Sequence, residues 1–489
     1  MDEYNQINLT IHWNQLIRDY EKKYSHYRLA EERSFYQGFP QGIPQLPTSL
    51  KLRDYQQKAV ISWFKNKGRG TLKMATGSGK TITALAITTE LYQKIGLQVL
   101  VVICPHRHLV VQWEKECKKF NLNPILAFES VYNWQSKLGT ELYNIQSHQK
   151  NFLTIITTNS TLINQGFQSQ VKFFPDKTLI VGDEAHHLGS SRLEASLPRN
   201  IGLRLALSAT PERYFDEEGT EALLSYFGEV IKPEFTLSDA IKKQALVPYL
   251  YYPIFVNLTE SEAFTYAKLT QRIGWALGKN DKIKNNDNLT TLLMQRSRLI
   301  GTAENKLNAL RELMKTILET KHTLFYCGDG YLENESQNYQ RQIEAVTRIL
   351  GRELGYHVNT YTAENTLEER EKIRQQFQKG DLQGLVAIRG LDEGIDIPEI
   401  EQAVILASTG NPHQFIQRRG RVLRPHPHKK QAIIYDMIVM PPDLDRQTWE
   451  VERNLLRKEL KRFMEFAKIA KNAEDASQKL MKIQEQYSL

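Results

Sequence analysis

Residues 71–81 read TLKMATGSGKT and lead directly into a helical pattern, ITALAITTELYQKIG. A loop that joins a strand to a helix in this way directs backbone N–H groups and the positive end of the helix dipole toward an anion. Gly77 and Gly79 lack a Cβ, so the backbone can approach phosphate oxygens closely. Lys80 then suits contact with β- and γ-phosphates, and the Thr81 hydroxyl suits Mg²⁺. The stretch predicts an α/β domain that binds ATP and Mg²⁺.

The first position of this phosphate loop departs from the general pattern. Met74 stands where that pattern has glycine, so the turn there must be made differently. The alternative interpretation is a glycine-rich turn that precedes Lys-Thr by chance. The residues expected to surround the phosphates are Ala75, Thr76, Gly77, Ser78, Gly79, Lys80 and Thr81.

Two adjacent carboxylates follow a second apolar run, TLIVG at residues 178–182. Carboxylates at the end of a buried strand are costly unless a cation or water network uses them. Phosphoryl transfer needs one acid to hold Mg²⁺ and another to position the attacking water. Asp183 suits the first role and Glu184 the second. A solvated acidic turn is the alternative, and the phosphate loop upstream in the same predicted sheet argues against it.

Strand-like and helical segments alternate along two long regions of the chain, which predicts parallel sheets covered by helices. We expect an α/β protein with two such domains in tandem and helical extensions at both ends. The expected parts are an N-terminal helical extension at 1–47, a first, ATP-binding domain at 48–235, a largely helical connecting segment at 236–305, a second domain at 306–440 and a C-terminal helical tail at 441–489.

The composition narrows the class of protein further. Hydrophobic residues make up 41% of the chain and charged residues 25%, which is ordinary for a globular protein. The formal net charge of +8 is compatible with a polyanionic partner without demonstrating one. The three cysteines lack zinc-finger or redox spacing, which favours a cytoplasmic location. The polar start is not typical of a signal peptide, and the apolar runs are too short to cross a membrane.

Six segments of the first half resemble, in order, the motifs of superfamily 2 DEAH-box helicases. They are LRDYQQKAV (52–60), MATGSGKT (74–81), CPHRHLVVQW (104–113), ITTNS (156–160), DEAH (183–186) and LSATPER (207–213). The likeness is strongest to the branch that contains restriction-enzyme motor subunits and DNA-repair translocases. It implies that both domains are RecA-like and that Gln56 contacts adenine. It also implies that His186, Ser208 and Thr210 couple the ATP site to a nucleic-acid site.

Four segments of the second half continue the resemblance. They are TLFYCG (323–328), YTAENTLEER (361–370), AIRGLDEGIDIP (387–398) and FIQRRGRVLRP (415–425). The resemblance implies nucleotide contacts from Gly394, Asp396, Gln417, Arg421 and Arg424. It implies nucleic-acid backbone contacts, without reading of sequence, from Arg107, Thr158, Thr362 and Arg389.

The arginines of the last segment also support a role in hydrolysis by their spacing. Arg421 and Arg424 are three residues apart and would share one helix face. Two guanidiniums that reach the γ-phosphate would stabilise its charge during transfer, and hydrolysis would then require closure of the two domains. The alternative is a basic surface patch for phosphate backbone, and we assign Arg418 and Arg419 to such a patch. The HPHKK run at 426–430 is expected to be a solvated loop.

These observations predict a nucleic-acid-dependent ATPase that acts as a helicase or translocase. The branch that it resembles favours DNA over RNA. The chain is also similar to helicase-like proteins of bacterial DNA-modification and phage-defence clusters, such as those of phosphorothioation-linked restriction. No nuclease signature is assigned, so the chain is expected to supply the motor for nuclease or modification-system proteins. No membrane partner is expected. An RNA helicase and an ATP-switched nucleic-acid sensor with slow turnover are the alternatives.

Overall fold

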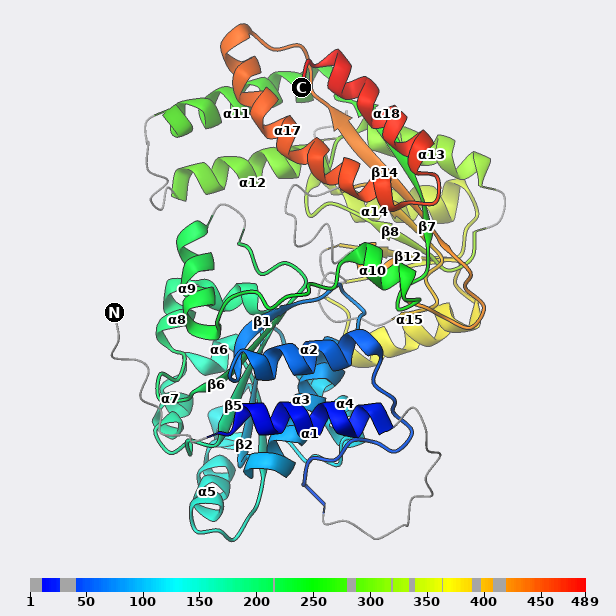
Figure 1. Cartoon of the computed structure of the whole chain (residues 1–489). Coiled ribbons are helices and arrows are strands. Elements are labelled where there is room, and N and C mark those ends of the chain that lie inside the picture. The colour runs from blue at the N-terminus through cyan, green and yellow to red at the C-terminus, as the bar shows by residue number, and fades with distance from the viewer. Residues whose placement is uncertain are drawn as a thin grey trace. The chain divides into compact units, whose positions relative to one another are not determined.

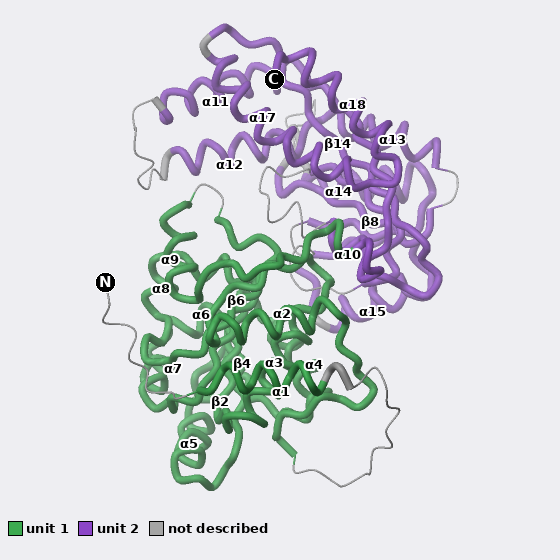
Figure 2. The backbone as a smooth tube through the Cα atoms, viewed as in Figure 1, with its two compact units in different colours: residues 1–240 green, residues 241–489 purple. Residues whose placement is uncertain are grey.

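The computed structural model forms two compact units, Met1–Ala240 and Ile241–Leu489 (Figures 1 and 2). Each unit is described by itself below. The residues that the structure describes are 11–26, 41–213, 216–278, 287–317, 320–333, 339–362, 364–388, 397–407 and 419–489.

Unit 1 is built on a six-stranded sheet in the order β1-β6-β5-β2-β4-β3, and all of its strand pairs are parallel. Most residues of its strands are buried, as in other parallel sheets that helices cover on both faces. The strands are β1 (Arg69–Lys73), β2 (Val99–Cys104), β3 (Ile125–Ala127), β4 (Leu153–Thr158), β5 (Thr178–Asp183) and β6 (Leu203–Ser208).

Helices cover this sheet and carry the chain between its strands. They are α1 (Trp13–His26), α2 (Asp54–Lys65), α3 (Lys80–Ile95), α4 (Arg107–Lys119), η1 (Val131–Asn133), α5 (Gln135–Gln146), α6 (Asn159–Leu162), α7 (Gln165–Val171), η2 (Ala185–Gly189), α8 (Ser191–Ala195), α9 (Glu217–Phe227) and α10 (Leu237–Lys242). The N-terminal α1 packs on α2, where Trp13 meets Trp63 edge-to-face at 6.3 Å between ring centroids. This aromatic contact fixes the N-terminal helix to unit 1.

Unit 2 has a second six-stranded parallel sheet, in the order β11-β12-β8-β13-β14-β7. Its strands are β7 (Tyr249–Asn257), β8 (Thr323–Tyr326), β11 (Val358–Tyr361), β12 (Gly384–Ala387), β13 (Gln402–Ile405) and β14 (Ala432–Met440). A separate antiparallel pair consists of β9 (Tyr331–Glu333) and β10 (Tyr339–Arg341).

The segment 236–305, expected to connect two domains, contributes a strand to this sheet. β7 pairs with β14 along nine residues and takes an edge position. Its side chains alternate between buried and partly exposed over most of its length, and Tyr249 and Tyr251 are buried. Tyr251 also has its backbone N–H and C=O paired at 2.9 Å with the side-chain amide of Asn472.

The helices of unit 2 include the expected C-terminal helical tail. They are α11 (Glu260–Gly278), α12 (Asp287–Gly301), α13 (Asn305–Thr316), α14 (Gln342–Arg348), η3 (Ile349–Glu353), α15 (Leu367–Lys379), α17 (Arg446–Ile469) and α18 (Ala473–Gln486). A buried polar contact joins α12 to α17, where Arg296 donates to Glu452 at 2.9 Å. Among the described helices, we find none with the length and apolar character that a membrane span needs. The expected fold class, two parallel α/β domains in tandem with helical extensions, is confirmed.

Candidate functional site

The phosphate loop has the backbone that its glycines predicted. β1 ends at Lys73 and α3 begins at Lys80, and the loop between them contains Gly77 and Gly79 at φ values of 81° and 84°. These values lie in the left-handed region that glycine adopts readily. A Cβ at Gly79 would also lie 2.5 Å from the side-chain nitrogen of Gln56. The second glycine is therefore required both by its φ and by close packing.

The unusual start of the loop is stabilised by two neighbouring segments. The Met74 N–H donates to the Ser208 carbonyl at 3.0 Å, and the Ala75 N–H donates to the Phe235 carbonyl at 2.8 Å. Met74 also forms a parallel β-bridge with Phe235, so its backbone is extended and tolerates a side chain. The turn that glycine usually makes at this position is thus replaced by pairing with β6 and with the chain beyond it.

The polar groups of the loop fit a bound polyphosphate. The Lys80 side chain is buried and donates to the Met74 carbonyl at 3.3 Å, so its ammonium spans the loop. The hydroxyls of Thr76 and Ser78 are buried and have no hydrogen-bond partner among the described residues. Buried hydroxyls without partners are uncommon, and ligand oxygens would satisfy them. Thr81 lies in the first turn of α3, next to Lys80.

Gln56 lies directly against this loop. Its side-chain oxygen accepts from the Arg53 N–H at 2.9 Å, and its side-chain nitrogen lies 3.4 Å from the Gly79 carbonyl. The preceding residue, Tyr55, donates to the Ser78 carbonyl at 2.8 Å and stacks on Phe235 at 3.8 Å between centroids. Neither Tyr55 nor Phe235 was expected at this site from the sequence. Tyr55 is adjacent to Gln56, but nothing in the sequence indicates its stacking partner.

The acidic pair lies at the end of the central strand β5. The Asp183 carboxylate is buried and accepts one hydrogen bond from the Trp113 indole at 2.8 Å and another from the Glu184 backbone at 3.1 Å. Burial, and to a smaller extent the charge of Glu184, raise the pKa of Asp183 to about 6, although the Trp113 hydrogen bond and the Lys80 charge oppose the increase. A divalent cation would offset this cost, so Asp183 fits a Mg²⁺ ligand.

Glu184 differs from its neighbour in both backbone and surroundings. Its φ of 43° places it in the left-handed region, which is rare for residues other than glycine and concentrates at functional sites. One carboxylate oxygen is buried and accepts no hydrogen bond from the described residues, although it lies 3.8 Å from His186 Nδ1. An oxygen of this kind can accept a hydrogen bond from a water.

The three residues expected to couple the sites lie together. His186 Nδ1 is 3.4 Å from the Ser208 hydroxyl, and the Thr210 N–H donates to the same hydroxyl at 3.1 Å. Arg213 adds a contact that the sequence analysis did not identify, because its guanidinium donates to the His186 carbonyl. Arg213 also pairs with Asp216, the N-cap of α9, at 2.6 Å. The segments 183–186 and 207–213 therefore form one connected network.

Arg421 and Arg424 lie in unit 2, in a segment whose end is fixed by a buried lysine. The Lys429 ammonium donates to the carbonyls of Val422 at 2.5 Å, Arg424 at 2.9 Å and Pro398 at 3.3 Å. Lys429 is only 6% exposed, and burial lowers its pKa to about 7. The expectation of a solvated loop at 426–430 is therefore wrong for Lys429, since three backbone acceptors draw it inward.

The burial of Arg419 contradicts a second expectation. We assigned it to a surface patch, but it is 1% exposed and its guanidinium pairs with Asp436 of β14. Tyr251 of β7 donates to the same carboxylate at 2.9 Å. Arg419 is buried because this carboxylate compensates its charge, so it anchors the segment to the sheet.

Four other predicted site residues and one assigned to the patch lie outside the described residues: Arg389, Gly394, Asp396, Gln417 and Arg418.

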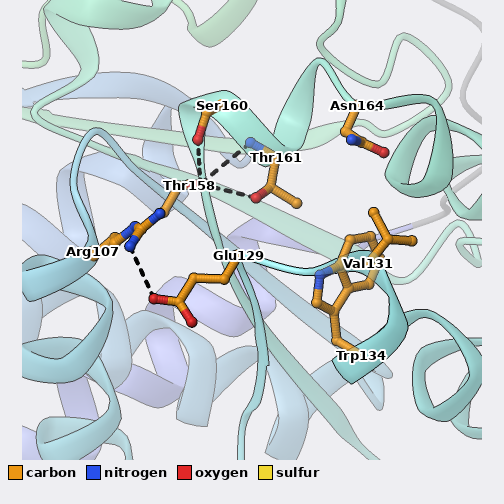
Figure 3. Close-up of a pocket in the computed structure, with 8 residues that line it drawn as sticks. All are labelled: Arg107, Glu129, Val131, Trp134, Thr158, Ser160, Thr161 and Asn164. Carbon is orange, nitrogen blue, oxygen red and sulfur yellow. Dashed lines mark hydrogen bonds and ion pairs between the residues drawn. The ribbon is translucent and has the colours of Figure 1, made fainter.

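Two of the residues predicted to bind nucleic acid line one pocket of about 200 Å³ in unit 1 (Figure 3). Arg107 begins α4, and its guanidinium pairs with Glu129 at 3.0 Å. The Thr158 hydroxyl lies 3.0 Å from the hydroxyls of Ser160 and Thr161. The remaining lining residues are Val131, Trp134 and Asn164.

Thr362, the third of these residues that the structure describes, lies in unit 2. Its N–H donates to the Asn365 side chain at 2.8 Å, just before α15.

Comparison with known proteins agrees with this geometry. Residues 49–213 match the family "Type III restriction enzyme, res subunit", and residues 306–426 match "Helicase conserved C-terminal domain". The chain belongs to the superfamily 2 helicases and is an ATP-hydrolysing enzyme of that class. The first of these matches lies within unit 1 and the second within unit 2.

Two relatives and one solved structure show how far the similarity extends. The DNA 3'-5' translocase XPB2 of Sulfurisphaera tokodaii is 26% identical over 440 residues, which cover 86% of this chain and 88% of the relative. The putative DNA 3'-5' helicase Rad25 of Haloarcula marismortui is 25% identical over 393 residues, and the match spans 80% of this chain but only 53% of that relative. The ATP-dependent Type ISP restriction-modification enzyme LlaBIII, solved bound to DNA, shares the fold with a TM-score of 0.55 at 20% identity, over 86% of this chain and 31% of that one.

Replacement of Lys80 with alanine is expected to abolish ATP turnover while the fold stays intact, because the ammonium supplies the positive charge at the β- and γ-phosphates. The measurement is the ATPase rate of the purified variant, with circular dichroism to verify folding. Lys94→Ala is a matched control, since Lys94 lies at the other end of α3 and pairs with Asp19 on the surface. Near-normal turnover of folded Lys80→Ala would contradict the assignment of the phosphate loop.

Proposed function

We propose that this protein is a DNA-dependent ATPase that uses Mg²⁺·ATP to move along DNA as a translocase or helicase. The observation that carries the proposal is the arrangement within unit 1. A phosphate loop with buried, unpartnered hydroxyls lies beside the buried Asp183 carboxylate, and a pocket that suits phosphates lies at the start of α4. The similarity to a DNA translocase and to a putative DNA helicase favours DNA as the polymer.

In the nucleotide site, we assign each group one task. Backbone N–H groups of Thr76, Gly77 and Gly79 and the Lys80 ammonium bind the β- and γ-phosphates. Thr81 and Asp183 would hold Mg²⁺, which neutralises phosphate charge when bound. Glu184 accepts a hydrogen bond from the attacking water and orients it.

Unit 2 supplies the remaining groups of the reaction in this proposal. Arg421 and Arg424 stabilise the charge that develops on the transferred phosphoryl group. Gln417, Gly394 and Asp396 complete the nucleotide contacts. Because these residues and the phosphate loop belong to different units, turnover requires the two units to act together, and ATP hydrolysis can then drive their motion.

The pocket at Arg107 suits the backbone of a nucleic acid. A guanidinium and a row of hydroxyls from Thr158, Ser160 and Thr161 offer donors to phosphate oxygens without access to base edges. The Glu129 carboxylate that pairs with Arg107 must release it when a phosphate arrives. Thr362 and Arg389 are assigned to the same polymer from unit 2.

Replacement of Arg107 with alanine is expected to weaken DNA binding and to leave ATP turnover without DNA unchanged. The loss of one phosphate contact should lower the slope of log affinity against log salt by about one unit. Fluorescence anisotropy with labelled DNA in a salt series measures both quantities. Lys118→Ala is the control, because Lys118 is an exposed cation on the last turn of the same helix. An unchanged slope would remove Arg107 from the nucleic-acid site.

Stimulation of the ATPase tests the function as a whole. We expect DNA, in single-stranded or duplex form, to increase the rate more than RNA does. Greater stimulation by RNA would favour an RNA helicase. A sensor that uses ATP closure as a switch would show slow turnover and no strand separation or displacement along DNA.

The biological setting belongs to the same proposal. The match of unit 1 to a restriction res subunit supports a motor in a restriction, phage-defence or repair system, with nuclease or modification proteins as partners. Co-purification with such a protein would support this assignment.

A further inference from the structure

One buried tryptophan has no task in the mechanism above, although it contacts the carboxylate at its centre. Trp113 is 1% exposed, and its indole Nε1 donates to Asp183 Oδ2 at 2.8 Å. An indole has a single N–H and accepts no hydrogen bond, so the direction of this bond cannot reverse. The other carboxylate oxygen accepts the Glu184 N–H, so the two bonds together fix the rotation of the Asp183 side chain.

The same helix that carries Trp113 begins in the nucleic-acid pocket. α4 starts at Arg107, and Trp113 follows six positions later, a rise of about 9 Å along the helix axis. Val110 and Cys117 are buried on α4 and secure it against the rest of unit 1. A short helix is stiff because each turn is hydrogen-bonded to the next, so a displacement of its first turn at Arg107 would be carried to Trp113.

We propose that Trp113 is a positioning residue that transmits nucleic-acid binding at Arg107 to the Asp183 carboxylate through α4. This inference rests on the proposed function, since it takes Asp183 as a Mg²⁺ ligand and the pocket at Arg107 as a phosphate site. A carboxylate oxygen can accept from Trp113 and still offer a lone pair to a cation. The indole therefore sets the direction in which that lone pair points, and residues that orient a metal ligand commonly govern metal affinity and activity.

The chain offers a close control for a purely structural role. Trp63 lies in the same unit, is 0% exposed, and donates its Nε1 to the Arg204 carbonyl at 3.2 Å. It thus matches Trp113 in burial and in the number of hydrogen bonds, but its acceptor is a backbone group with no task in the mechanism. Phenylalanine in place of either tryptophan removes the N–H and keeps an aromatic ring in the core.

The experiment compares full-length Trp113→Phe and Trp63→Phe by ATPase assay at a temperature where circular dichroism shows both fully folded. For Trp113→Phe, we expect the Mg²⁺ concentration for half-maximal rate to rise, or the maximal rate to fall, by about 10- to 100-fold. The ratio of DNA-stimulated to basal rate should fall toward one, while DNA affinity and KM for ATP stay near their original values. Trp63→Phe should change none of these quantities.

Two further variants distinguish a failure of the inference about Trp113 from a failure of the proposed Mg²⁺ site. Trp113→His keeps a ring N–H and should restore part of the Mg²⁺ response and of the stimulation; equal losses in the histidine and phenylalanine variants would overturn the inference in favour of packing. The inference would also be overturned if Trp113→Phe and Trp63→Phe showed the same Mg²⁺ response and the same stimulation by DNA. Asp183→Asn tests the underlying site by itself. If that variant keeps Mg²⁺-dependent turnover, the proposed metal site is wrong, whatever Trp113 does.

Discussion

Glutamine in place of Glu184 is expected to slow ATP turnover by ~10²-fold or more, the contribution typical of a general base. The substitution preserves the size of the side chain, but an amide cannot take up the proton of the attacking water. ATP and Mg²⁺ should still bind, because the phosphate loop and Asp183 are unchanged. Single-turnover hydrolysis and equilibrium binding of a fluorescent ATP analogue measure the two steps separately.

The Glu184→Gln enzyme should accumulate in its ATP-bound, nucleic-acid-bound state, which an electrophoretic assay with labelled DNA can detect. Glu221→Gln is the matched control, since Glu221 is an exposed carboxylate on α9 of the same unit. A loss of ATP binding in Glu184→Gln would assign this residue to the metal or to the fold instead of to water.

Alanine in place of Arg424 is expected to lower turnover by ~10³-fold or more, as removal of an arginine finger does in other phosphoryl-transfer enzymes. ATP affinity should change little, because unit 1 supplies most of the contacts to ATP before the reaction. DNA binding without nucleotide should also stay near its original strength. The measurement is the ATPase rate at saturating DNA, together with a salt series of DNA affinity.

A basic patch for DNA would give the reverse result. Turnover at saturating DNA would then be nearly normal, and the salt dependence of binding would fall by about one unit of slope. Lys430→Ala provides the control, because Lys430 is exposed next to the buried Lys429 in the same unit. The free energy of unfolding of Arg424→Ala should be compared with that of the unaltered protein as well, since the Arg424 carbonyl is one of the three acceptors of Lys429.

The phosphate loop could be predicted from the sequence because its geometry is local. The spacing of Gly77 and Gly79 determines the backbone, and Lys80 then follows at the start of a helix. The acidic pair could be predicted for a similar reason, since an apolar run followed by two carboxylates indicates a strand end. The alternation of strands and helices likewise predicted both parallel sheets.

The contacts that fix these groups in place could not be predicted, because they join distant parts of the chain. Trp113 and Asp183 are 70 residues apart, and Arg213 and the His186 carbonyl are 27 apart. Arg419 was predicted to be exposed because a run of arginines is usually solvated. Its buried partner, Asp436, lies on a strand that only the tertiary structure brings close.

The place of β7 in the second sheet was also beyond local reasoning, and that place has a consequence for how the protein is made. Among the strands of unit 2 that the structure describes, β7 is the first to leave the ribosome, but its partner strand in the sheet, β14, is the last. Tyr249 pairs with Ala432, which is 183 residues later. Pairing across such a distance is slow, because a long loop must close first.

During that interval, the aromatic-rich segment YLYYPIFVN has two unpaired edges and is prone to join strands of other chains. Pro253 interrupts its hydrogen-bonding groups and reduces this hazard, as prolines in edge strands do. The outer edge at Tyr251 is covered only when Asn472 has been synthesised and its amide has bound the strand backbone. Nascent chains in which β7 has been synthesised, but whose growing end has not yet reached Asn472, are therefore those that most need protection by chaperones.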